Sequence, residues 1–112
     1  MAWILVVDDE DYLRTIFKEF LIKKHHQVLL ATNGREALSL FNSYHVDLVL
    51  TDCVMPKMDG IELTAKIKEK NPHMPVIMIT STPPAEHRAD VLLDKPVSLT
   101  LLAKNIDVLA GE

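Results

Sequence analysis

Apolar positions along the chain fall into short continuous runs separated by stretches with helical spacing. Five runs have the length of β-strands: WILVVD (3–8), QVLLAT (27–32), VDLVLTD (46–52), PVIMIT (75–80) and DVLLD (90–94). Elsewhere apolar residues recur every three or four positions and predict amphipathic helices at 10–24, 34–44, 61–70 and from a Ser98 cap to near Gly111. Strands that are apolar on both faces and alternate with helices indicate a parallel sheet between helical layers, an α/β doubly wound fold.

The connection between the fourth and fifth predicted strands interrupts this alternation. Only residues 81–90 are available there. Proline is tolerated only in the first turn of a helix, so any helix in this segment must begin at Pro83-Pro84. We therefore expect a loop or about one helical turn in place of a fourth crossover helix. Ten extended residues, at roughly 3.3 Å each, can still return along a five-residue strand. We expect the fifth strand to be parallel, because an antiparallel strand would carry Lys95, which follows it, to the opposite edge of the sheet from Asp52, which ends the third strand.

Length and composition favour one ordinary globular domain spanning residues 1–112. The chain is 48% hydrophobic and 25% charged, and it has no low-complexity tract. A net charge of −4 with scattered Lys and Arg argues against direct nucleic-acid binding. No membrane span or signal segment is visible, so we expect a cytoplasmic protein without a membrane partner. Cys53 is the single cysteine, which excludes an internal disulfide and is typical of a small core residue.

Polar residues gather where the predicted strands end. Asp8 and Asp9 end the first strand, Asp52 the third and Thr80 the fourth, and Lys95 follows the fifth. If the sheet order is 2-1-3-4-5, the first and third strands are neighbours at the switch point and the three aspartates converge there. Carboxylate oxygens are hard ligands, and a site with only a few of them suits Mg²⁺, which keeps several bound waters. Lys95 supplies a positive charge and Thr80 a hydroxyl donor, so the set could stabilise a phosphoryl group during its transfer to Asp52.

The same stretches carry a resemblance to a known family. Its matching segments are VVDDE (6–10), DLVLTDCVMPKMDG (47–60), VIMITS (76–81) and LLDKP (92–96). Over essentially its whole length, the chain resembles the receiver domain of a bacterial two-component response regulator, of the chemotaxis-regulator type. The resemblance implies a flavodoxin-like five-stranded sheet of order 2-1-3-4-5, here with the fourth helix shortened or missing.

The resemblance also implies roles for individual residues. Asp52 would accept a phosphoryl group from a phosphohistidine on a sensor histidine kinase or phosphotransfer protein. The implied Mg²⁺ ligands are Asp8, Asp9, Asp52 and the backbone carbonyl of Val54, with Asp8 acting mainly through a bound water. Thr80 and Lys95 would contact the acyl phosphate, and the peptide bond before Pro96 would be cis. Such a domain promotes its own phosphorylation and dephosphorylation but works as a signalling switch rather than as an enzyme. We expect it to be a monomer or a weak homodimer. Its effector is a protein that the sequence does not identify.

Several positions depart from the family's usual residues. Leu92 stands where an aromatic residue often reports movement of the Thr, and Val97 stands where Phe is common. Val54 and Thr82 occupy the two variable positions that flank the site. The apolar Val54 offers no hydrogen bond to an attacking water, so we expect slow hydrolysis of the phosphorylated state.

Alternative functions remain at this stage. A phosphorylation-independent interaction module, or pseudo-receiver, would keep the acidic site while the missing helix disables switching. An aspartate-nucleophile phosphatase is disfavoured because it would need an Asp where Val54 stands. A flavin-binding domain is disfavoured because the acidic first loop (8–11) would repel the phosphate of the flavin.

All five histidines are expected to be solvated surface residues: His25, His26, His45, His73 and His87.

Overall fold

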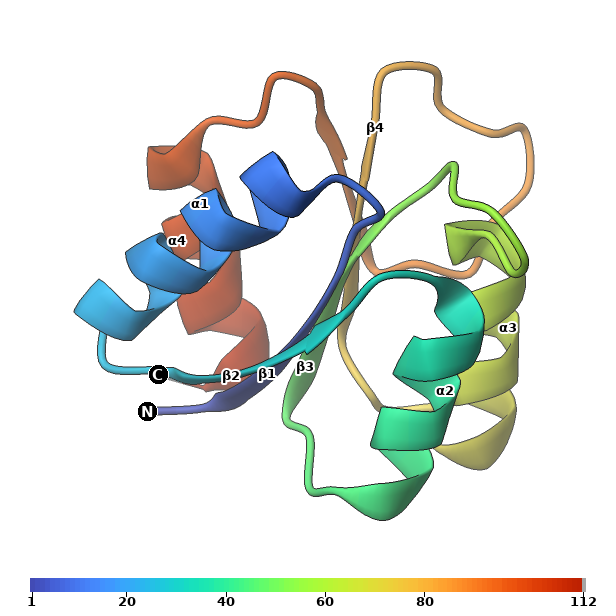
Figure 1. Cartoon of the computed structure of the whole chain (residues 1–112), viewed down its shortest axis with the longest axis horizontal. Coiled ribbons are helices and arrows are strands. Elements are labelled where there is room, and N and C mark those ends of the chain that lie inside the picture. Colours follow the sequence, from blue (N-terminus) through green and yellow to red (C-terminus); the bar gives the residue numbers. More distant parts are fainter. Residues whose placement is uncertain (112) are drawn as a thin grey trace.

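The computed structural model describes residues 1–111 as a central sheet between two helical layers (Figure 1). Its elements, in chain order, are β1 (Trp3–Val7), α1 (Asp11–Lys23), β2 (Gln27–Ala31), α2 (Gly34–Ser43), β3 (Leu48–Asp52), α3 (Gly60–Lys70), β4 (Val76–Thr80), β5 (Val91–Asp94) and α4 (Leu99–Ala110). The strand order is β2-β1-β3-β4-β5, and every neighbouring pair is parallel. The predicted fold class and strand order are therefore confirmed.

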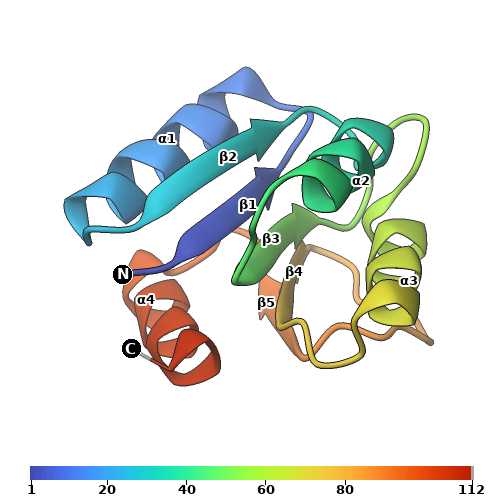
Figure 2. The same cartoon turned by 90° about the horizontal axis from the view of Figure 1, so that it is seen from below.

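Alternation along the strands divides the core between the two faces of the sheet. Ile4 and Val6 of β1 are buried on the face that α1 and α4 cover, whereas Leu5 and Val7 are buried on the face that α2 and α3 cover. Figure 2 shows α1 and α4 on one side of the sheet and α2 and α3 on the other. Both faces are thus apolar, as expected for a parallel sheet.

Polar side chains cap three of the helices at their first turns. Asn33 accepts a hydrogen bond from the backbone N–H of Glu36, and Asp59 accepts one from that of Glu62. Ser98 caps α4 in the same way, as its sequence position predicted. Because Asp59 is the cap, α3 begins at Gly60, one residue earlier than predicted.

The connection between β4 and β5 is a loop without a helix. Residues 81–90 pass alongside α3 in Figure 1, and β5 still pairs in parallel with β4. Asp90 holds the end of this loop: its N–H donates to the Val76 carbonyl over 2.9 Å, and its Oδ2 accepts from the Val76 N–H over 2.8 Å. Lys68 of α3 is buried and donates to the same Asp90 oxygen over 2.7 Å. The short parallel crossover is therefore fixed to both the sheet and α3.

One expectation about the histidines is wrong. His26 is buried, and its Nδ1 accepts a hydrogen bond from the Ala2 N–H over 3.1 Å. It directly precedes β2, where the chain turns back from α1 to the sheet edge. Tertiary packing of the N-terminus encloses it, which its polar neighbours in the sequence did not indicate.

Candidate functional site

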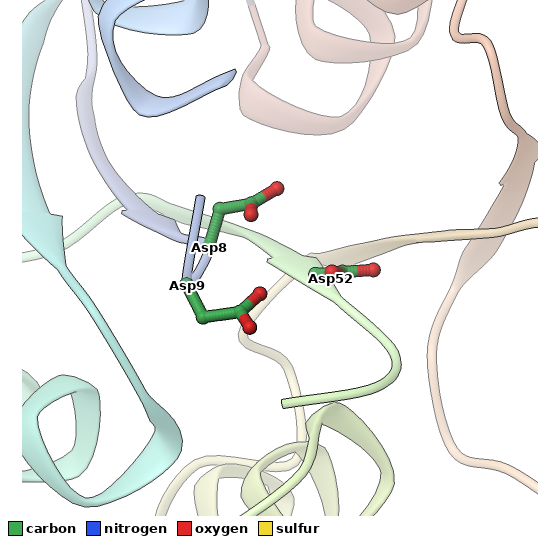
Figure 3. Close-up of side chains that lie close together, drawn as sticks. All are labelled: Asp8, Asp9 and Asp52. Atoms are coloured by element: carbon green, nitrogen blue, oxygen red, sulfur yellow. The ribbon is translucent and has the colours of Figure 1, made fainter. Parts of the chain in front are cut away.

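Three aspartates meet at the carboxyl edge of the sheet (Figure 3). Asp8 and Asp9 follow β1 directly, and Asp52 is the last residue of the neighbouring strand β3. Because the paired strands are parallel and Val7 lies opposite Thr51, all three fall at the same level of the sheet. One carboxylate oxygen from each lies within 4.8 Å of the others. The predicted convergence of these residues is thus observed.

Asp52 lies at the bottom of this cluster and is almost completely buried. Its Oδ1 accepts a hydrogen bond from the Cys53 N–H over 2.8 Å and lies 2.9 Å from the Lys95 Nζ. The Lys95 side chain remains 30% exposed, so its ammonium can follow a change in the charge beside it. The Lys95-Pro96 peptide bond is cis, as the resemblance implied.

The charged groups at this edge shift the pKa values of one another. Burial raises the pKa of Asp8 to about 6. The hydrogen bond from the Glu10 N–H and the charge of Lys95 oppose this rise, and the charges of Asp52 and Asp9 add to it. Burial by itself would lower the pKa of Lys95, but its hydrogen bond to Asp52 and the nearby negative charges raise that pKa above its ordinary value. Lys95 is therefore a cation. The three carboxylates of the cluster together carry more charge than its ammonium.

Thr80 lies at the same edge but is engaged elsewhere. Its hydroxyl donates to the Thr82 carbonyl over 2.9 Å and accepts from the Thr82 N–H over 3.1 Å. The hydroxyl is thus turned toward the start of the β4–β5 loop, and none of these hydrogen bonds reaches Asp52. A hydroxyl group has one hydrogen to donate, so a new acceptor at the site would have to replace the Thr82 carbonyl.

Two glycines, Gly34 and Gly60, support the loops around Asp52. A Cβ on Gly60 would lie 2.1 Å from the Asp52 carbonyl oxygen, and the Gly60 N–H donates to the Cys53 carbonyl over 2.8 Å. A Cβ on Gly34 would lie 2.4 Å from the Met58 carbonyl oxygen, which accepts the Gly34 N–H over 3.1 Å. Helices α2 and α3 therefore approach the β3–α3 loop closely and fix the backbone that carries Asp52. The Asn33-Gly34 and Asp59-Gly60 pairs were the available sequence signal.

Val54 and Cys53 lie on the loop that follows β3, and Leu92 lies on β5. Val54 lies on the β3–α3 loop with its side chain 76% exposed, so it places an apolar group at the rim of the site. Cys53 is buried beneath the site, as predicted. Burial raises the pKa of its thiol above the usual value, and the neighbouring Thr80 side chain offsets part of that rise. Leu92 is partly buried on β5, the outer strand beside β4.

The donor set is chemically selective. Carboxylate oxygens are hard ligands, and Mg²⁺ typically binds one or two of them while keeping several waters. The residues around this edge thus fit a divalent cation better than a soft metal, because Cys53 is buried with its pKa raised and no histidine belongs to the cluster among residues 1–111. The arrangement pairs a buried carboxylate with a mobile cation and a group of potential metal ligands.

The strand order and the acidic cluster at the switch point define a flavodoxin-like α/β domain. Comparison with known proteins agrees with this fold and identifies a family. Residues 4–107 match the family model of the response regulator receiver domain, and the chain belongs to this family.

The chain is also similar to individual curated proteins. It is 34% identical over 114 residues to the sensor histidine kinase RcsC of Escherichia coli K12, covering 96% of this chain and 12% of that protein. It is 41% identical over 78 residues to the chemotaxis protein CheY of Halobacterium salinarum, covering 70% of this chain and 65% of that protein. The chain thus spans about an eighth of the kinase that it matches.

Solved structures show the same architecture. A CheY-like receiver domain protein from Methanospirillum hungatei superposes with a TM-score of 0.93 at 28% identity, covering 99% of this chain and 94% of that one. The response regulator TrrA of Thermotoga maritima, solved in complex with Mg²⁺ and BeF, gives a TM-score of 0.91 at 32% identity, covering 97% of this chain and 99% of that one.

Within residues 1–111, none of the helices is long and apolar enough to cross a membrane.

Proposed function

We propose that the chain is a phosphoacceptor domain of a two-component signalling system, with Asp52 as the residue that takes the phosphoryl group. One observation carries the proposal: Asp52 is buried among two other aspartates, and Lys95 is 2.9 Å from one of its oxygens. A structural ion pair alone would not need three carboxylates within 4.8 Å, because each adds repulsion. Membership of the receiver family supports the same role.

The acidic cluster is suited to hold Mg²⁺. We assign Asp8, Asp9, Asp52 and the backbone carbonyl of Val54 as its ligands, with Asp8 acting mainly through water. The cation would supply positive charge beside the phosphoryl oxygens as their charge develops. Asp8 and Asp9 then serve to bind and orient, and Asp52 remains the only carboxylate assigned to react.

Transfer of the phosphoryl group is a displacement at phosphorus. An Asp52 oxygen forms the new bond to phosphorus, while the bond between phosphorus and the donor's histidine nitrogen breaks, and the released imidazole takes a proton from water. Lys95 exchanges its ion pair with Asp52 for one with the phosphoryl oxygens, which keeps negative charge opposite its ammonium. This domain's own residues thus promote the reaction, and its product is a modified domain rather than a released molecule.

Thr80 links this chemistry to the surface of the domain. When its hydroxyl donates to a phosphoryl oxygen, it must give up the bond to the Thr82 carbonyl. The start of the β4–β5 loop then loses a contact, so phosphorylation shifts the population of loop conformations. We propose that the loop at residues 81–90 reports phosphorylation in place of the missing helix, since Leu92 offers no aromatic ring.

The partners that we propose follow from this role. The phosphodonor is a sensor histidine kinase or a phosphotransfer protein, and several relatives bear the name of sensor kinases. Residues 1–112 act as one receiver domain, located in the cytoplasm and monomeric or weakly dimeric. The effector is a protein that contacts the phosphorylated surface.

Phosphorylation by a small donor tests the proposal without the natural kinase. Incubation with Mg²⁺ and acetyl phosphate should add one acid-labile phosphoryl group, which intact-mass measurement detects. Asp52→Asn should abolish the adduct. Asp107→Asn changes an exposed aspartate on α4 and should leave it unchanged. An adduct that persists in Asp52→Asn would reject the assignment.

A pseudo-receiver is the second candidate, favoured specifically by the missing helix. In that case no adduct would form with Mg²⁺ and acetyl phosphate, while a protein partner would still bind. The two functions therefore differ in one measurable product.

A further inference from the structure

A cavity opens beside the phosphoryl site on the face covered by α1 and α4. Its volume is about 480 Å³, within the range of small-molecule sites. The lining residues are Asp8, Leu13, Ile16, Phe17, Ile79, Lys95, Pro96, Val97 and Leu99. Seven of these nine are apolar, and they come from α1, β4, the segment that joins β5 to α4, and the first residue of α4.

The interior of the cavity is suited to an aliphatic chain. Phe17 and Ile79 are buried in the core on this face, so the walls are fixed by packing. Val97 is a small side chain in the β5–α4 connection. A larger residue at this position would extend into the same space.

The polar end of the cavity carries excess negative charge. Asp8 is nearly fully buried, and its Oδ1 accepts the Glu10 N–H over 2.9 Å. Its Oδ2 accepts no hydrogen bond from residues 1–111. Every fully enclosed side-chain oxygen in these residues has a hydrogen-bond partner, so Oδ2 is not fully enclosed and a ligand can reach it. Asp9 and Asp52 add two further carboxylates close by. Two cations face them: the ammonium of Lys95, and the guanidinium of Arg14, which donates to the Asp8 backbone carbonyl and pairs with the carboxylate of Asp11. Charge complementarity therefore favours a cationic head group over an anionic one.

We propose that this cavity binds a small amphipathic amine, with its alkyl chain among Ile16, Phe17 and Val97 and its ammonium group against Asp8. The site is separate from phosphoryl transfer in its chemistry, but it shares Asp8 with the acidic cluster. The ammonium and Mg²⁺ neutralise the same carboxylates, so each ligand weakens the binding of the other by the same factor.

A chain-length series tests the proposal on the whole domain without Mg²⁺. Butylamine, hexylamine, hexanol and hexanoate are titrated while amide shifts and heat are recorded. Each added methylene in the amine should tighten binding by about 4-fold while the cavity has room. Hexylamine should bind more tightly than hexanol, and hexanoate most weakly. Added Mg²⁺ should weaken hexylamine binding.

A matched pair of variants locates the site. Val97→Phe fills the cavity and should remove the gain between butylamine and hexylamine. Val108→Phe makes the same change at a side chain that is 79% exposed on α4 and should leave the series unchanged. Equal binding of hexanol and hexylamine, an unchanged series in Val97→Phe, or no binding by any amine would each overturn the proposal. Acetyl phosphate labelling of Asp52 in the same variants reports separately on the phosphoacceptor function.

Discussion

The buried ammonium of Lys68 stabilises the short crossover, and its removal gives a measurable prediction. Lys68→Met keeps the length and apolar stem of the side chain but removes donors to the Met74 carbonyl and to Asp90 Oδ2, both at 2.7 Å, as well as a longer 3.5 Å contact with the Pro72 carbonyl. Hydrogen bonds to charged groups contribute roughly 1.5–3 kcal/mol each. Asp90 is 38% exposed and can be hydrated again, and the cost of burying the ammonium also disappears. We expect a net loss of about 2 kcal/mol in the free energy of unfolding.

Urea unfolding followed by circular dichroism measures this loss. At roughly 4 °C per kcal/mol, the melting temperature should fall by about 8 °C. Lys70→Met, two residues further along the same helix and exposed, should change the free energy of unfolding by less than about 0.5 kcal/mol. A double-mutant cycle with Asp90→Asn isolates the pair, and we expect a coupling of about 1 kcal/mol or more. A Lys68→Met variant as stable as the original, or additive effects in the cycle, would refute the role given to Lys68.

Three further predictions concern the site itself. Gly60→Ala should destabilise the fold by about 1–3 kcal/mol, because the added Cβ would collide with the Asp52 backbone. Gly111→Ala meets no neighbouring atom, but its φ of 75° should cost about 1–2 kcal/mol. Equal melting temperatures for Gly60→Ala and the original chain would contradict the first expectation. The pKa of Asp8 is raised from 3.8 to about 6, so the folded state binds the proton more tightly, and without Mg²⁺ the stability should fall by up to about 3 kcal/mol as pH rises from about 4 to 6. Urea unfolding of Asp8→Asn should lack this contribution, and an identical pH slope would exclude it. Val54→Asn should accelerate loss of the phosphoryl group, measured by intact mass over time, with little effect on stability because the side chain is exposed; an unchanged rate would count against the expected role of Val54.

The strand-end residues of the site could be predicted because they depend on topology alone. Apolar runs fixed the strands, and parallel pairing then placed Asp8, Asp9 and Asp52 at one edge. Strand ends were less accurate: β3 begins at Leu48 rather than at position 46. There the Asp47 side chain accepts the Trp3 N–H, and this contact with another strand is not visible in a local pattern.

Side-chain partners that depend on packing were not predicted. Lys68 follows Ile67 and lies on the same face of α3 as Thr64, and the Ile67 and Thr64 side chains are both buried. A lysine near the end of a helix is nevertheless usually solvated. Its carbonyl partners become apparent only when the α3–β4 turn is folded around it. The Thr80 hydroxyl was expected at the phosphoryl site, but a local bond with Thr82 competes for it, as is common for Ser and Thr at turns.

The most direct test of the central claim is the site of phosphorylation. The chain is incubated with acetyl phosphate, with and without Mg²⁺, and the modified residue is located by tandem mass spectrometry after borohydride trapping. We predict a single Mg²⁺-dependent modification at Asp52. No modification, or a modification at any other residue, would contradict the account.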